Sequence, residues 1–509
     1  MILKYFLEHE LINMLKSKRI FLTVIMFLIL FASIFIVRVV NYQKQINEYL
    51  SEVMLAEDAM KNLPNYSHIN PKAINRPLVF SIYNQGFQFN RVISILFFEA
   101  IENSESINEG VNLVYFGKNN IDITFLITFF LSLFILLISY DSVNGEKKTG
   151  TLRLLMTYPI KRQSFILKKM LGVFIFVSFT FTFPFALSLF ILLFMYGSLL
   201  TGSFFLSAFF YWFLVLLFIF FFCMLGIFLS VCTTSPDRSL VFSLLTWMLL
   251  SIILPICWEN IISRKLYANQ LNHLKRTVID RRLIAEEIHS NFEWDGNIVH
   301  ITGNSRNTNK VELFSFTRMY QMHYRLQRYL YDFMSPAIFD VETAADNIQR
   351  KLINIENTKN RIFFFNPIVL FQNMSNLIAG NSRSDYLSFL SDGRSIRNDL
   401  TGTGVKEGWL FDYRYFAMYD DENLMWDEDV FWHKYMTIDI EELSQELSML
   451  LENAKKFSFD LPAIRRYEQP NLSFGEIFNK IIEVLALLIA SILALLIITW
   501  YKFMRYDVR

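Results

Sequence analysis

The chain has 509 residues and a formal net charge of +1, and 53% of its residues are hydrophobic. A nearly neutral balance gives no indication of a nucleic-acid partner or an acidic substrate. The apolar residues, 53 Phe among them, are concentrated in a few long blocks, which is typical of membrane-spanning helices rather than of soluble domains. The three cysteines lie in or beside those blocks, so neither a disulfide framework nor a metal site is expected.

Residues 1–19 are expected to form an amphipathic helix that lies in the plane of the membrane interface. Leu3, Leu7 and Leu11 share one face of this helix, and Lys4 and Glu8 lie outside that face. The alternative is a cytoplasmic extension of the first span. The apolar block that follows is too long for a signal peptide and has no cleavage site, so we expect it to remain as an anchor.

Six apolar blocks are each long enough to cross a bilayer core of about 30 Å as a helix. They are residues 20–40, 121–140, 170–196, 204–231, 240–258 and 481–500. We expect Pro184 to kink the third span. Arg38, at the outer end of the first span, is expected to extend its charged group toward the interface.

Basic residues indicate the orientation of these spans. They gather before the first block, between the second and third, between the fourth and fifth, and after the sixth. The positive-inside rule then places the loop 141–169, the tail 501–509 and both termini in the cytoplasm, with the chain in the inner membrane. The polar regions 41–120 and 259–480 are consequently extracytoplasmic. The predicted fold class is a mainly α membrane protein with six transmembrane helices and a mostly helical, α+β extracytoplasmic domain.

The larger outer region should contain both helices and loops. Apolar residues recur at helical spacing over 265–289 and 311–333. Helices are also expected over 340–362, which contains helix formers, and over 438–457. Residues 393–432, rich in Gly, Asp and aromatic residues, are expected to form loops with short strands. Ser473 and Glu476 form a capping box ahead of the last span.

The loop 141–169 reads DSVNGEKKTGTLRLLMTYPIKRQSFILKK. Glu146, Lys147 and Lys148 precede Gly150. A short amphipathic helix is expected over 152–158, Pro159 ends it, and Lys161 and Arg162 lead to the next span. A short helix held against the cytoplasmic face suits docking into a groove of a soluble partner. An ordinary basic loop that follows the positive-inside rule stays open as the alternative.

The same loop resembles the coupling segment of ABC-2 type permeases, which are membrane subunits of transporters. The matching residues are Glu146, Lys147, Gly150, Thr151, Leu152, Leu155, Pro159 and Arg162. An interfacial N-terminal helix and six spans with both ends inside are similar to that family too. The resemblance implies that these residues contact the ATPase, that two ATPase subunits carry ATP and Mg, and that this chain binds no cofactor. It also implies a second permease chain, identical or related.

The outer region 259–480 resembles a sub-group of that family with a long insert between the fifth and sixth spans. The similar residues are the run 366–372, the run 377–380, Tyr386 and Phe389. This likeness indicates the type of region and implies no ligand.

Aromatic residues crowd two acidic runs in this outer region. We single out Trp409, Tyr413, Tyr415, Trp426 and Trp432. They could line a surface for a lipid-like ligand, a peptide or a second copy of the chain, or they could form the core of a small domain. The acidic runs are expected to be solvated loops, with calcium binding as the alternative.

The sequence contains neither a G-x-x-x-x-G-K-[ST] phosphate loop nor a G-x-S-x-G motif. Hydrolysis of ATP is therefore expected from another polypeptide, and this chain is not expected to be an enzyme. Charges are nearly absent within the spans, which disfavours an ion-coupled transporter and favours export of a hydrophobic or amphipathic cargo. Two alternatives stay open: a membrane-anchored receptor or scaffold whose outer domain binds a protein, driven by an ATPase without cargo, and a membrane enzyme with an extracytoplasmic site.

Overall fold

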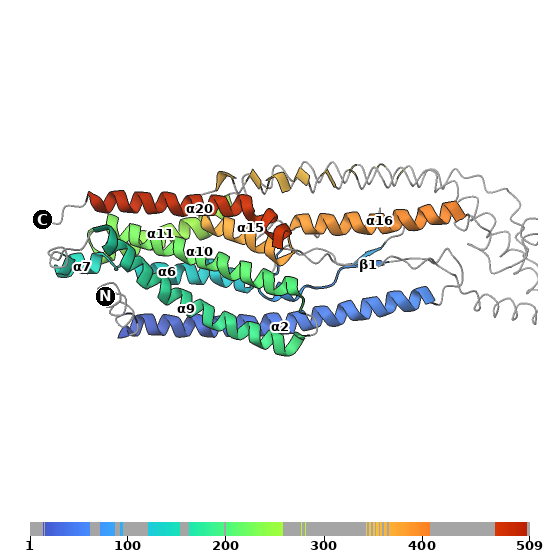
Figure 1. The fold of residues 1–509 in the computed structure, drawn as a ribbon, viewed down its shortest axis with the longest axis horizontal. Coiled ribbons are helices and arrows are strands. Elements are labelled where there is room, and N and C mark those ends of the chain that lie inside the picture. Colours follow the sequence, from blue (N-terminus) through green and yellow to red (C-terminus); the bar gives the residue numbers. More distant parts are fainter. Residues whose placement is uncertain are drawn as a thin grey trace, which may run out of the picture.

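The computed structural model describes residues 16–61, 72–86, 92–94, 121–152, 162–197, 200–257, 366–407 and 474–505, with residue 14 and isolated positions between 276 and 363. Six helices within these ranges are long and apolar enough to cross a membrane. They lie side by side as an elongated bundle (Figure 1). The predicted class, a mainly α protein with six spans, is confirmed for the described residues.

The spans coincide with the six apolar blocks. They are α2 (Lys18–Lys61), then α5 (Ile123–Phe125) with η3 (Leu126–Leu131) and α6 (Ser132–Ser139), α9 (Arg162–Tyr196), α10 (Gly202–Cys232), α11 (Pro236–Met248) with η5 (Leu249–Ile253) and α12 (Leu254–Cys257), and α20 (Phe474–Met504). α2 continues well past residue 40, so part of the predicted outer region 41–120 is an extension of the first span. α9 passes through Pro184 as one helix.

α10 occupies the centre of the bundle and packs against α6, α9 and α20. A helix that is apolar all round belongs in a protein core or a bilayer, and α10 buries every side chain over 221–227, whereas Phe205, Phe209 and Phe213 nearer its start are exposed. It approaches α6 closely at Gly226, where an added Cβ would lie 1.8 Å from Ser139 Oγ. A residue without a side chain therefore sets the distance between these two helices.

Two spans contain π-helical turns, η3 and η5, and each turn offers a carbonyl oxygen to a neighbouring element. The Trp247 Nε1–H donates to Phe129 O in η3 over 3.2 Å. The Asn366 side-chain amide donates to Leu250 O in η5 over 3.1 Å. Irregular backbone at membrane depth is tolerated where protein groups satisfy it, as they do at both turns.

A further helix, α15 (Pro367–Ala379), lies inside the bundle although it belongs to the region 259–480. It packs against α10 and α20, and Figure 1 shows it beside α20. The Phe371 ring lies 4.8 Å from the Phe218 ring near the middle of α10. α15 ends at Gly380, whose φ of 66° is a left-handed conformation that favours glycine. α15 is too short to span a bilayer, so length alone gave no reason to place it among the spans.

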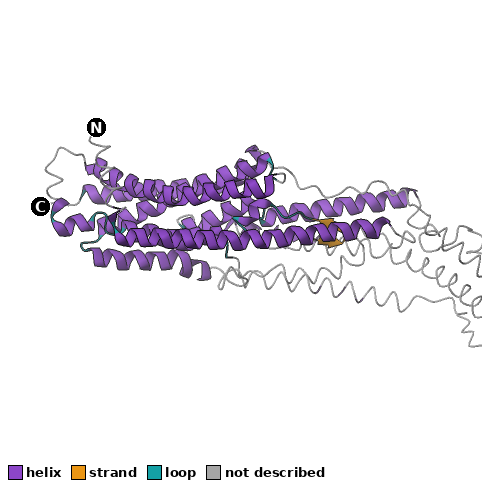
Figure 2. Ribbon diagram, turned by 90° about the horizontal axis from the view of Figure 1, so that it is seen from below, coloured by secondary structure: helices purple, strands orange, loops and turns teal. Residues whose placement is uncertain are grey.

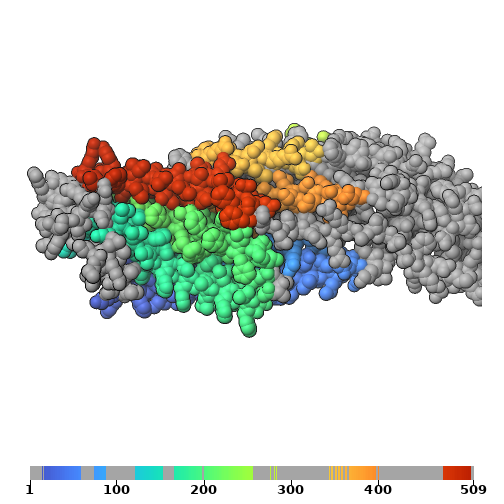
Figure 3. Space-filling model, viewed as in Figure 1, coloured from blue at the N-terminus to red at the C-terminus, as the bar shows by residue number. Residues whose placement is uncertain are grey.

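α16 (Arg383–Glu407) leads away from the bundle, roughly parallel to the extension of α2 (Figures 1 and 2). Three ion pairs connect α16, α20 and the helical positions between 343 and 362. These pairs are Lys480–Asp385 at 2.7 Å, Arg394–Asp346 at 2.7 Å and Arg361–Glu483 at 3.0 Å. The space-filling view shows α16 (orange) and those positions (yellow) beside the outer part of α20 (red) (Figure 3).

A short antiparallel pair lies along the extension of α2: β1 (Lys72–Ile74) with β2 (Val92–Ser94), Lys72 opposite Ser94. The 3-10 turn η2 (Val79–Ile82) follows β1 and is buried. Asn84, just beyond it, donates to Ser375 Oγ and Asn376 Oδ1 of α15, over 3.0 and 2.9 Å. The described segment that follows η2 is therefore fastened to α15.

Two expectations are not met. Arg38 does not extend to the interface; it is 4% exposed and donates to Ser81 O and Gln85 Oε1, each over 2.7 Å. Residues 393–407 form a helix rather than loops, because the buried Phe389 and Ile396 hold α16 in place and tertiary contacts override the low helix propensity of glycine. The described positions within 340–362 are all helical, as predicted, and a turn follows at Phe363. Ser473 and the predicted helix 438–457 lie outside the described residues.

Candidate functional site

The loop between α6 and α9 begins with α7 (Asn144–Thr149), a short helix at the end of the bundle where α2 starts and α20 finishes (Figure 1). Gly150 ends α7 with a φ of 77°, a conformation that L residues with side chains rarely adopt. α7 was not among the helices predicted from the sequence. The predicted helix 152–158 falls mainly on residues outside those described, apart from Leu152, which is helical and buried.

Hydrogen bonds fix the base of α7 to the end of α10. The backbone N–H groups of Val143 and Asn144 both donate to Ser230 Oγ over 3.1 Å. The Asn144 side-chain amide donates to Thr233 Oγ1 over 2.6 Å. One hydroxyl thus accepts from two of the N–H groups that the start of a short helix leaves without helical partners.

Lys147 strengthens the same junction. Its Nζ donates to Val231 O over 2.9 Å and to Thr233 O over 3.2 Å. These carbonyls belong to the C-terminal end of α10, where backbone oxygens lack helical partners and the helix dipole is negative. An ammonium group there supplies hydrogen bonds and a favourable charge together.

Glu146, the preceding residue, is directed to a different helix. Its Oε1 lies 2.5 Å from Lys169 Nζ on α9, and the side chains are 19% and 7% exposed. One turn before Lys169, the Phe165 ring stacks on Phe503 of α20 with 6.0 Å between centroids. The loop therefore contacts α9 directly and reaches α20 through α9.

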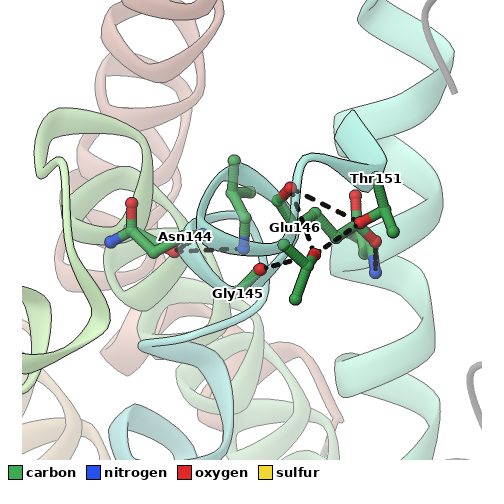
Figure 4. A network of polar contacts seen from close by, with 8 residues as sticks. Asn144, Gly145, Glu146 and Thr151 are labelled. Atoms are coloured by element: carbon green, nitrogen blue, oxygen red, sulfur yellow. Dashed lines mark hydrogen bonds and ion pairs between the residues drawn. The ribbon is translucent and has the colours of Figure 1, made fainter. Parts of the chain in front are cut away.

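The tip of the loop is exposed and polar. Residues 148–151 are all exposed, and the Thr149 and Thr151 hydroxyls lie 2.8 Å apart. Figure 4 shows Thr151 beside Glu146, whose backbone oxygen accepts from the Thr151 hydroxyl over 3.4 Å. Leu152 then turns inward with 3% exposure. The tip thus stands between two anchored ends.

The structure brings together five of the eight predicted coupling residues: Glu146, Lys147, Gly150, Thr151 and Leu152. Leu155 and Pro159 lie outside the described residues, and Arg162 is placed by its backbone as the first residue of α9. The predicted aromatic surface is also outside them: Trp409, Tyr413, Tyr415, Trp426 and Trp432.

Four residues whose side chains hold the loop were absent from the prediction: Asn144, Lys169, Ser230 and Thr233. Asn144 and Ser230 are 86 positions apart, and no local pattern connects residues at such a separation. The charge of Lys169 was interpreted only as an indicator of orientation. Within the described ranges, no group of three or more His, Cys, Asp or Glu side chains could hold a metal ion. The arrangement is suited to fastening and transmitting movement.

The chain is similar to known transporter proteins. A family model described as an ABC-2 family transporter protein matches residues 6–508. A relative from Pseudomonas aeruginosa, called a probable ABC transporter permease protein NosY, is 48% identical over 50 residues, which are 10% of this chain and 18% of the relative. A protein of the same description from Stutzerimonas stutzeri is 47% identical over 47 residues, 9% of this chain and 17% of that relative. The chain thus matches less than a fifth of the length of either relative.

Proposed function

The chain belongs to the ABC-2 family of transporter proteins, and from this premise we propose that it is the permease subunit of an ATP-driven exporter. Separate ATPase subunits bind ATP and Mg, and the loop at α7 couples their movement to the spans. The observation that carries this proposal is the exposed tip at 148–151 on a base fastened to α9 and α10. Packed helices move as discrete bodies, so a push on a fastened element is transmitted as helix movement.

We propose that the protein lies in the inner membrane and that the end of the bundle carrying α7 faces the cytoplasm. The start of α2, α7 and the finish of α20 lie together (Figure 1). The basic residues Lys18, Arg19, Lys148, Lys502 and Arg505 belong to those three elements or directly adjoin them. Their clustering at one end supports the positive-inside assignment.

The proposed cargo is hydrophobic or amphipathic. The described charged residues of the spans lie toward their ends, as Arg38 does near the outer end and Lys169 near the opposite one. Ion-coupled transporters instead place ionisable groups at the depth where the ion binds. The core of the bundle is packed mainly with apolar and aromatic side chains, and this composition supports a hydrophobic cargo over an ion.

The proposed assembly contains two permease chains and two ATPase subunits. One chain supplies one such loop, and the family resemblance implies that ATP is hydrolysed between two ATPase subunits. The second permease is an identical or related chain. In this assembly each permease presents its loop to the pair of ATPase subunits.

We expect a gene for an ATP-binding-cassette ATPase beside the gene of this chain, and the test is co-expression of the two. We expect a detergent-solubilised complex whose mass corresponds to two permeases and two ATPases, and an ATPase rate that changes when the complex is placed in liposomes. An ATPase variant unable to bind ATP controls for nonspecific association. An ATPase that neither associates with the chain nor changes its rate would refute the proposal.

A second function is favoured by the ion pairs that join α20, α16 and the helical positions 343–362. These contacts would carry movement of a span outward, so an ATPase could move an extracytoplasmic protein-binding region without exporting cargo. The two functions differ in one measurement. Mechanical work predicts ATP-dependent change in the separation of labels on the outer helices with no cargo present, whereas export predicts a change that requires cargo.

A further inference from the structure

We infer that Glu146 and Lys147 are positioning residues, which fasten the coupling loop to α9 and α10, and that the ATPase contacts the exposed edge 148–151 instead. This inference rests on the proposed function and changes the role of two of its residues. Family resemblance assigns both residues to the ATPase contact, whereas the structure uses both side chains within the chain.

The two charges are adjacent in sequence but are bound to different helices. The Glu146 carboxylate is paired with Lys169 of α9. The Lys147 ammonium is bound to the terminal carbonyls Val231 O and Thr233 O of α10. This divergence holds α7 at two points, which prevents it from pivoting about either helix alone.

A contact role would require these bonds to break. If Glu146 turned toward a partner, the Lys169 side chain, 7% exposed, would lose its carboxylate while remaining buried. Removing one member of a buried ion pair is strongly unfavourable because it leaves an uncompensated charge. The neighbouring residues 148–151 are exposed already and can meet a partner without that cost.

The fastening also gives the loop a way to transmit force. A push on the tip reaches α9 through Glu146 and Lys169, and reaches α10 through Lys147 and the Ser230 hydroxyl. α9 in turn contacts α20 through the Phe165–Phe503 stack. The Glu146–Lys169 ion pair therefore connects the tip to α9. The experiment must remove and then restore the charge complementarity of this pair.

The first measurement needs no ATPase. A nitroxide label is attached to T149C in a chain whose Cys223, Cys232 and Cys257 are replaced by serine, reconstituted in liposomes. We expect E146K and K169E each to increase the mobility of the label, and the exchanged pair E146K/K169E to restore the original spectrum. E146Q, which removes the charge without reversing it, provides the same test if a reversal prevents folding. The exchange K44E/E48K, at an exposed pair on α2 with side chains 77% and 61% exposed, is the matched control and should change nothing.

The second measurement uses the complex with the neighbouring ATPase. We expect the single reversals to leave the complex assembled but to reduce the effect of the permease on the ATPase rate by about tenfold, within the usual range of coupling between sites. The exchanged pair should recover most of that effect. K148E should instead weaken assembly while leaving the label immobile.

The outcomes separate the two ideas. If E146K or K169E abolishes assembly while the label stays immobile, Glu146 contacts the ATPase and the inference is wrong. An exchanged pair as mobile as the single variants also overturns it. If the unaltered chain never associates with the ATPase but the label responds as expected, the Glu146–Lys169 pair does position the loop and the proposed function is wrong.

Discussion

At the residue scale, a single glycine allows α6 and α10 to approach each other closely, near the end of the bundle that carries α7. An added Cβ at Gly226 would lie 1.8 Å from Ser139 Oγ and 2.8 Å from Ser139 Cβ. The serine hydroxyl also donates to Ile135 O within α6 over 2.7 Å. Both the side-chain position and the backbone of α6 are therefore constrained, and the helices would have to separate to admit a methyl group.

We expect Gly226→Ala to destabilise the protein by about 1–3 kcal/mol, the usual cost of overpacking a filled core. The midpoint of thermal unfolding in detergent measures it. Gly475→Ala is the matched control, because nothing lies within 4 Å of its added Cβ and it also lies in a spanning helix. The double variant Gly226→Ala with Ser139→Gly removes the clashing atoms and should recover part of the loss. An unfolding midpoint for Gly226→Ala equal to that of Gly475→Ala would contradict the close approach.

At the scale of elements, α15 is held in the bundle by Asn366, the residue that precedes it. Asn366 accepts from Ile368 N–H over 3.1 Å, which caps the helix, and its amide donates to Leu250 O in η5 over 3.1 Å. The side chain is fully buried. One residue thus satisfies the start of one helix and the irregular turn of another, so α15 and the fifth span are expected to lose stability together.

We expect Asn366→Ala to cost about 2–4 kcal/mol, since it removes the cap and leaves a buried carbonyl without this donor. Asn366→Ser retains an oxygen that can cap the helix and should cost less. Ser235→Ala is the control, because Ser235 precedes α11 without a side-chain capping bond. The midpoints of thermal unfolding in detergent rank the three variants by their loss of stability. Equal losses for Asn366→Ala and Asn366→Ser would show that capping contributes nothing here.

At the scale of the whole molecule, both ends of the described chain and α7 lie at one end of the bundle, and the extension of α2 and α16 projects from the other (Figure 1). An even number of spans returns the chain to the side on which it started. The arrangement therefore makes one prediction for all exposed positions: those at opposite ends of the bundle face opposite compartments.

We expect a cysteine at Ser51, on the extension of α2, to react with an impermeant thiol reagent added outside the cytoplasmic membrane of intact cells. A cysteine at Thr149 should react only after the membrane is opened. Both positions are exposed, so a difference between them reports sidedness and not burial. Serine replaces the three native cysteines in both variants. The reverse pattern would invert the orientation, and equal labelling would refute the spans between them.

The six spans were predictable from sequence because the hydrophobic requirement of a bilayer acts on each segment separately. A block such as 204–231 must be apolar along its length and must bond its own backbone, whatever it packs against. The basic loop after residue 140 was recognisable for a similar reason, since charge asymmetry across a membrane is a property of each short segment.

Only the tertiary structure decided where Arg38, Glu146 and α15 belong. Arg38 is bound to Ser81 and Gln85, more than 40 positions away, and Glu146 is paired with Lys169 rather than directed outward. α15 is too short to indicate a membrane position, and it is stable inside the bundle because α10 and α20 cover its apolar faces. A charge or a short apolar helix is stabilised by the partners that folding brings to it, and the identity of those partners is not a local property of the sequence.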